Sequence, residues 1–302
     1  MTRRVTAVSL ACLLAVGFTP PLHLQASSVE AAPLRALPAA RCGAVHAFKV
    51  PAPRSPKPGD VAKVMTELGR RLAGITPPAQ ITVPVYAHVI TRGARRVTGQ
   101  DVKAQIDALN TAYAGGYGGV DTGVRFQLDG VTVTENDAWF ADPVANERPM
   151  KVALHQGDAR TLNLYIAQLS EQMLGFASYP YWYDESPRLD GVVIDWRSLP
   201  GGAMSNYNRG FTGVHEIGHW LGLFHTFENG CDLPGDGIAD TPMEARPTEG
   251  CPADKDSCTS PGGDPMHNFM DYAHDTCMSE FTQGQADRMR QMWAVYRNTP
   301  QV

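Results

Sequence analysis

Three histidines lie within eleven positions of one short segment. The segment GVHEIGHWLGLFHTF, residues 213–227, carries them at His215, His219 and His225. On a helix, two side chains four residues apart project from one face, so His215 and His219 can bind the same metal ion. Gly222 allows the helix to end in a left-handed turn, which returns the chain and His225 toward that ion.

Three neutral imidazoles and one open coordination position describe a catalytic zinc site, because a structural zinc site is closed by a fourth protein ligand. The spacing therefore predicts zinc with a bound water. Glu216 lies beside the two helical histidines, and it is predicted to act as the general base that takes a proton from this water. This chemistry suits hydrolysis of an amide. The alternatives are an accidental match and a metal site without activity.

Four strands are predicted from β-branched residues and short apolar runs. The first of them contains Pro84, which favours an edge position or a bulge near the start of that strand. The predicted strands cover residues 81–90, 124–133, 161–166 and 191–194.

Three further helices are predicted from apolar periodicity and from capping signals. Thr98 and Thr282 each open a capping-box pattern, and Asp60 is a candidate N-cap. These helices cover residues 61–72, 98–113 and 282–296. The order of elements predicts an α+β fold with an α/β-type first half, followed by a loop-rich half and a final helix.

The N-terminal region has the composition of targeting and linking segments. Residues 1–26 combine a basic start with a short apolar run and predict a secretory signal peptide. Cys12 raises a lipoprotein alternative, which its place inside the apolar run disfavours. Residues 27–75 are rich in Pro, Ala and Arg in their first half and are interpreted as a pro-segment and linker. The main domain is expected at residues 76–302.

Charge and hydropathy limit the partners of the exported protein. The formal net charge is -5, with no run of Lys and Arg, which argues against a nucleic-acid partner. No segment after the signal is apolar enough to span a bilayer. We therefore expect a secreted monomer without a membrane anchor.

The cysteines are consistent with export. The signal peptide contains one of the six, Cys12, and four of the remaining five lie late in the chain. Four cysteines allow three disulfide pairings. Cys42 stands alone in the Pro/Ala-rich leader, as an unpaired thiol, an incidental cysteine or one end of an intermolecular bridge. The late cysteines are Cys231, Cys251, Cys258 and Cys277.

The extended histidine motif, followed by a Met-containing turn, resembles the metzincin clan of zinc endopeptidases. Within that clan the chain is similar to the pappalysin family, which includes ulilysin-like and cytophagalysin-like enzymes. The resemblance covers about residues 80–297, and the first 75 residues carry it only weakly. The segments that carry it are 174–180, 190–194, 219–227, 235–242, 268–272 and 277–278.

The resemblance implies a fold and several roles. A twisted, mostly parallel sheet with helices and the active-site helix would fill residues 76–225, and a disulfide- and calcium-stabilised subdomain would fill residues 226–302. Met270 would be the Met-turn residue beneath the zinc, with Met278 as the alternative. Tyr272 would donate to the oxyanion.

The resemblance also implies how substrate binds. One strand would lie at the sheet edge and pair with protein or peptide substrates in extended conformation. The alternative is an ordinary buried strand. The residues of this stretch are Gly175, Phe176, Ala177, Ser178 and Tyr179.

Two features of the late loops follow from the same resemblance. The disulfides would pair Cys231 with Cys258 and Cys251 with Cys277. Oxygen-bearing side chains in a Gly/Pro-rich loop suit a structural calcium ion, although acidic surface loops are usually only solvated. The candidate calcium ligands are Asp232, Asp236, Asp240, Thr241 and Glu244.

Regulation and specificity are predicted from single residues. Cys42 would occupy the open zinc position of a zymogen, because a thiolate is a good zinc ligand. Cleavage after Arg54, Arg70 or Arg71 would then activate the enzyme. Asp275 would line the pocket after the scissile bond and favour Arg or Lys there, or else it is one more exposed acid.

The sequence thus predicts a secreted zinc endopeptidase that is made as a zymogen. A non-catalytic peptide-binding module stabilised by zinc and calcium, using the same cleft, is the alternative. The presence of Glu216 and Tyr272 favours the enzyme, because a binding module needs neither residue.

Overall fold

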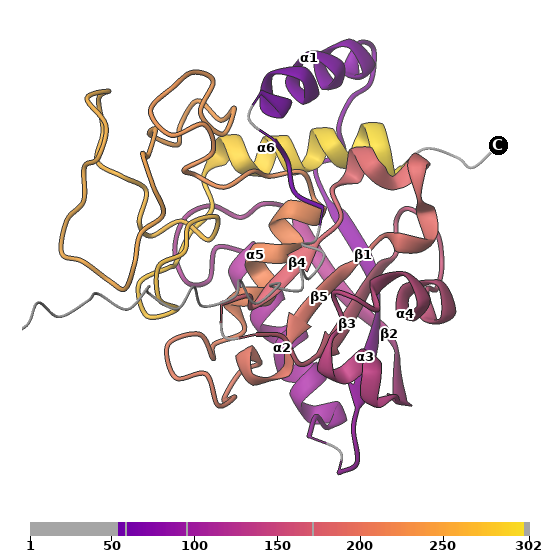
Figure 1. The fold of residues 1–302 in the computed structure, drawn as a ribbon. Helices are drawn as coiled ribbons and strands as arrows, with labels where there is room; N and C mark the ends of the chain where they lie inside the picture. The colour runs from indigo at the N-terminus through magenta and orange to yellow at the C-terminus, as the bar shows by residue number, and fades with distance from the viewer. Residues whose placement is uncertain (1–53, 58, 95, 171, 299–302) are drawn as a thin grey trace, which may run out of the picture. The chain divides into compact units, whose positions relative to one another are not determined.

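A five-stranded sheet forms the centre of the described part of the chain (Figure 1). The computed structural model describes residues 54–57, 59–94, 96–170 and 172–298, so the signal peptide and Cys42 lie outside the described residues. The strand order is β2-β1-β3-β5-β4, with β4 antiparallel to β5 and the other pairs parallel. The strands are β1 (Ile81–Thr91), β2 (Val124–Glu135), β3 (Leu162–Ala167), β4 (Gly175–Ala177) and β5 (Val192–Asp195).

Strand β1 lies in the interior of the sheet, between β2 and β3. The edge position that Pro84 predicted is therefore wrong, whereas the bulge is confirmed by a register shift between Val85 and Tyr86. Pairing of β1 with β3 begins only at Val85. Because Pro84 precedes that pairing, its missing N–H breaks no hydrogen bond to β3.

Helices cover both faces of the sheet. Alternate residues of β5 point to opposite faces, so Val192 and Ile194 join the core under α2 (Gly99–Tyr113) and α5 (Phe211–Trp220), and Val193 joins another core. That other core contains Phe140 and Met150. They come from α3 (Asp137–Ala141) and α4 (Glu147–Leu154).

The helix termini follow the predicted capping signals in two of three cases. The capping boxes at Thr98 and Thr282 are present and open α2 and α6 (Gln283–Met292). Asp60 is not an N-cap: it is the first residue of α1 (Asp60–Leu72), and Gly59 takes the cap position with a left-handed φ of 83°. Glycine adopts this backbone without the steric cost that a Cβ would add.

Helix α1 packs on the C-terminal end of the described chain (Figure 1). Val61, Val64 and Leu68 are buried on one helical face. They share a core with Tyr179, Phe224, Met292, Val295 and Tyr296. The last two belong to the π-helical turn η4 (Trp293–Arg297), which continues α6.

Long loops connect α5 to α6. They contain no strand or helix of regular length, and two disulfides cross-link them, Cys231 to Cys258 and Cys251 to Cys277. These are the pairs that the resemblance implied. Bridges that close loops of this length stabilise segments with little apolar content of their own.

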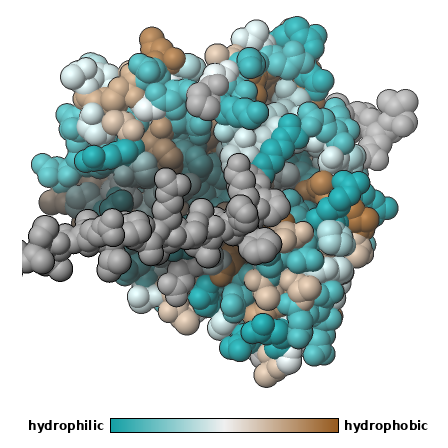
Figure 2. All heavy atoms as spheres, in the orientation of Figure 1, coloured by the Kyte–Doolittle hydropathy of each residue, from teal (hydrophilic) through white to brown (hydrophobic). Residues whose placement is uncertain are grey.

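Hydrophobic side chains are interspersed with hydrophilic ones on the face shown in Figure 2. On the face shown in Figure 2, hydrophilic residues predominate and hydrophobic ones lie apart from each other. No helix in the described part of the chain combines the length and apolarity that crossing a membrane requires.

Candidate active site

Helix α5 carries the first two histidines on one face and is buried along its whole length. Gly218 lies between them, and a Cβ on this residue would stand 2.4 Å from Sδ of Met270. Met270 itself is fully buried. The methionine therefore packs directly against the histidine helix, and only glycine leaves room for it at that position.

At the end of α5 the chain turns back toward the helix face that carries His215 and His219. The N–H of Leu223 donates to the Gly218 carbonyl at 2.9 Å, and the N–H of Gly222 donates to the His219 carbonyl at 2.8 Å. Together with the φ of 95° at Gly222, these bonds form a Schellman motif. This turn brings His225 next to the helical pair.

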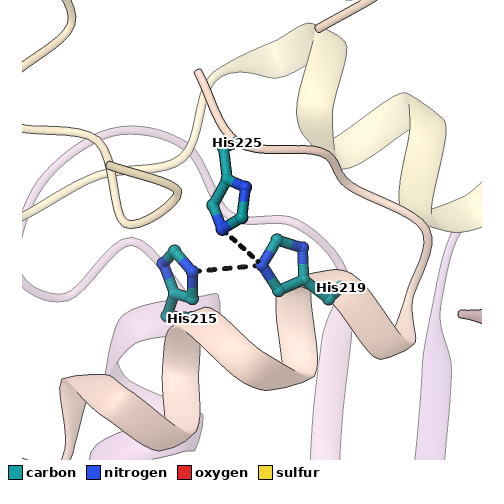
Figure 3. Close-up of side chains that lie close together, drawn as sticks. All are labelled: His215, His219 and His225. Atoms are coloured by element: carbon teal, nitrogen blue, oxygen red, sulfur yellow. Dashed lines mark hydrogen bonds between the residues drawn. The ribbon is translucent and has the colours of Figure 1, made fainter. Parts of the chain in front are cut away.

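The three imidazoles converge through their Nε2 atoms (Figure 3). Nε2 of His219 lies 3.1 Å from Nε2 of His215 and 3.1 Å from Nε2 of His225. Two ligands of a tetrahedral zinc ion, each about 2.0–2.1 Å from the metal, stand at nearly this separation. The donor set fits zinc, and among the described residues it is the one group of three or more potential metal ligands that converges.

Backbone carbonyls orient two of the rings. Nδ1 of His215 lies 2.7 Å from the Phe269 carbonyl, and Nδ1 of His219 lies 2.8 Å from the Leu223 carbonyl. An Nδ1–H that donates to a carbonyl leaves Nε2 as the unprotonated ligand atom. Burial lowers the pKa of His215 to about 4 and also lowers the pKa values of His219 and His225. The rings are therefore neutral near pH 7, as metal binding requires.

Glu216 lies on the cleft side of α5 and is 8 % exposed. Burial raises the pKa of its carboxyl group to about 8 in the metal-free protein. Strand β4 approaches it so closely that a Cβ on Gly175 would stand 2.5 Å from the Glu216 Cγ. Gly175 thus makes the space in which the Glu216 side chain lies.

Tyr272 reaches the histidines from the loop that follows Met270. Its hydroxyl lies 3.0 Å from Nε2 of His225, and its ring contacts those of His225 and Phe227. Burial raises the pKa of the phenol, so the hydroxyl keeps its proton and can donate it in a hydrogen bond.

These groups line one cleft of about 450 Å³ together with strand β4. Strand β4 is the edge strand of the sheet beside β5. Of the predicted substrate-binding stretch, Gly175, Phe176 and Ala177 form this strand. The N–H of Ser178 donates to the Gly191 carbonyl. Tyr179 lies outside β4 and points inward, with its hydroxyl 2.9 Å from Nδ1 of His219.

Asp275 lines the same cleft and is 1 % exposed. One carboxylate oxygen accepts the N–H of Arg209 at 2.7 Å. The other has no hydrogen-bond partner of ordinary geometry among the described residues. Burial raises the pKa of Asp275 to about 6. The alternative that it is one more exposed acid is therefore wrong.

The carboxylates among the candidate calcium ligands do not form a convergent group of three or more in the described part of the chain. Asp236 accepts the hydroxyl of Thr241 at 2.8 Å. Asp240 binds the start of α6, through the Gly284 N–H at 2.9 Å. Glu244 forms an ion pair with Lys255. The fifth, Asp232, is exposed.

Sequence reasoning missed two side chains that contact the Nδ1 atoms of the histidines, on the side away from the metal position. Glu228 has a carboxylate oxygen 3.5 Å from Nδ1 of His225, and its position three residues after His225 was an available signal. Tyr179 was assigned to the substrate strand rather than to His219. No sequence pattern reveals that contact, because 40 residues separate the two.

Comparisons with known proteins agree with this geometry. Residues 148–294 match the family model described as pregnancy-associated plasma protein-A, Peptidase_M43. An extracellular metalloprotease of Sordaria macrospora is 41% identical over 242 residues, which are 76% of this chain and 80% of that protein. A relative with the same description from Arthroderma benhamiae is 38% identical, over 79% of this chain and 87% of its own length.

Two solved structures from Tannerella forsythia are similar. A promirolysin variant matches with a TM-score of 0.67 and 26% identity, over 78% of this chain and 89% of its own. Mature mirolysin in complex with a cleaved peptide matches with a TM-score of 0.60 and 29% identity, over 74% of this chain and all of its own.

Proposed function

Because the chain belongs to the pappalysin family of extracellular metallopeptidases, we propose that it is a secreted zinc endopeptidase that cuts extended peptides with Glu216 as general base. The observation that carries this proposal is the meeting of three Nε2 atoms, a buried carboxyl group and a sheet edge in one cleft. His215, His219 and His225 would hold the metal.

Each residue has a chemical task in this mechanism. Zinc, when bound, supplies a Lewis acid that makes water nucleophilic near neutral pH. Glu216 takes the proton of the attacking water and delivers it to the leaving amine. Tyr272 donates its hydroxyl proton in a hydrogen bond to the developing oxyanion. Strand β4 offers its free edge to the substrate backbone, which aligns the scissile bond with Glu216.

Cleavage of a mixed peptide library tests the function directly. We expect the activated protein to cut peptides, a zinc chelator to abolish cutting, and added zinc to restore it. We propose that Asp275 favours Arg or Lys after the scissile bond, because its buried, unpaired oxygen lines the cleft. The library would therefore be enriched in basic residues there. Protein that binds zinc and peptide but cuts nothing would instead support the non-catalytic binding module.

Tyr272→Phe should lower kcat about 10²-fold with little change in KM. Tyr272 as a residue is 47% exposed, so we place the loss at the lower end of the range measured for a single oxyanion donor. The measurement is steady-state kinetics on one library substrate, with zinc content determined in parallel. Equal kcat for both proteins at equal zinc content would exclude the donor role.

We propose that activating cleavage follows Arg54, not Arg70 or Arg71. The latter two lie in α1 and pair with Glu67, whereas a peptidase requires an extended chain. Cutting there would also remove the helix whose apolar face covers Phe224 and Tyr179. Residue 55 is thus the expected mature N-terminus, which N-terminal sequencing of activated protein checks. An active species that begins at residue 71 or 72 would contradict this. The latency role of Cys42 stays a prediction.

A further inference from the structure

Arg54 lies against a surface at one end of the cleft. Its guanidinium carbon is 4.1 Å from the centre of the Trp182 ring. Its Nη1 is 2.6 Å from Oε2 of Glu185. Arg54 also lines the cleft that contains His215 and Glu216. A basic side chain 131 residues away in sequence from Glu185 thus occupies this end of the cleft.

The surface that contacts Arg54 offers the two kinds of group that bind a guanidinium, an aromatic ring and a carboxylate. An aromatic face and a carboxylate beside it attract a planar cation through stacking and through an ion pair. Trp182 and Glu185, which supply these two groups, belong to the 3-10 helix η1 (Pro180–Glu185). The Trp182 ring packs edge-to-face on Tyr179, with centroids 5.0 Å apart. Tyr179 is 3 % exposed, so the aromatic part of this surface is supported by the protein core.

The position of this surface connects it to the substrate path. Helix η1 follows β4 with only Ser178 and Tyr179 between them. An extended peptide that pairs with the edge of β4 would therefore pass η1 as it leaves that strand. Asp275 and Tyr207 line the cleft as well, but they come from other segments and are not part of η1. Asp275 therefore lies in the cleft itself, whereas Glu185 lies outside its lining and reaches it only through Arg54.

We propose that Trp182 and Glu185 form a substrate subsite that binds an Arg or Lys side chain away from the scissile bond, and that Arg54 fills it in the full-length chain. The inference rests on the proposed peptidase function for its physiological occupant. It predicts a second basic determinant of specificity, separate from the one proposed for Asp275. The side chains of Arg54 and Glu185 are 54% and 60% exposed, so the expected preference is about 5- to 10-fold.

Peptide binding to full-length protein tests the subsite without requiring turnover. The background is Cys42→Ser combined with Glu216→Gln, so that the predicted latency contact does not block the cleft, and the ligands are an otherwise uncharged peptide with Arg at one scanned position and its norleucine counterpart. The readout is the ratio of the two Kd values. Arg54→Met should free the subsite. At one scanned position, the arginine peptide should then gain about 5- to 10-fold in affinity relative to the norleucine peptide. Adding Glu185→Gln should abolish the shift.

A neighbouring acid provides the matched control. Asp184 is exposed and adjacent to Glu185, so Asp184→Asn removes the same charge from the same turn and should leave the shift intact. A ratio that Arg54→Met does not change overturns the subsite. Equal loss with Asp184→Asn and Glu185→Gln also overturns it, because a general charge effect would then suffice. Failure of the peptidase proposal is distinguishable, since it is measured as absent cleavage by activated wild type.

Discussion

Glu216→Gln is expected to lower kcat by about 10²–10⁴-fold, the contribution of a positioned general base, while zinc content stays at the wild-type level. The side chain is nearly isosteric, and Gly175 leaves the same space for it. The amide cannot accept the proton of the attacking water. Steady-state kinetics with metal analysis checks the expectation. Unchanged kcat at full zinc occupancy would rule out this residue as the base.

The same variant has an opposite effect on the metal-free protein. Burial raises the pKa of Glu216 from 4.5 to about 8, so folding disfavours the charged carboxylate. Its cost to stability is absent below pH 4.5, grows as the pH rises, and is complete above about pH 8. With chelator present, Glu216→Gln should therefore have a higher Tm than wild type at pH 8–9 and an equal Tm at pH 4–5. A difference that does not depend on pH would contradict this.

The predictable part of the site is the part encoded by local spacing. His215 and His219 share a face because a helix repeats every 3.6 residues, and Gly222 fits the left-handed turn that returns His225. The capping boxes at Thr98 and Thr282 are local in the same sense. Each of these signals lies within a few residues of its structural consequence, so one sequence is sufficient to read it.

The unpredicted part depends on contacts between distant segments. The contacts of the acidic loop are an example: Asp240 binds the start of α6 at Gly284, and Glu244 pairs with Lys255, while the calcium ion proposed for this loop stays a prediction. Of the two alternatives for Pro84, the bulge is confirmed, whereas the sheet edge is wrong because β3, which pairs with the rest of β1 on that side, comes more than 70 residues later. The sequence shows which polar side chains a loop carries, but only the fold determines which groups those side chains contact.

The largest effect on stability is expected at such a long-range contact. Asp190, just before β5, forms an ion pair with Arg297 in η4, at 3.0 Å, and both side chains are completely buried. The carboxylate also accepts the indole N–H of Trp220, the last residue of α5. This pair therefore ties the histidine helix to the sheet and to the C-terminal helix.

Asp190→Asn should lower the free energy of unfolding by about 3–5 kcal/mol, because it leaves the Arg297 guanidinium buried without a counter-charge. Burial already lowers the pKa of Arg297, which indicates how poorly that position solvates a lone cation. Urea unfolding of the zinc-loaded, disulfide-intact protein measures the loss. Asp158→Asn is the matched control. It breaks the partly exposed pair with Arg160 and should cost less than about 1 kcal/mol. Equal losses of unfolding free energy in the two variants would mean that the buried Asp190 pair stabilises the protein no more than the partly exposed Asp158 pair.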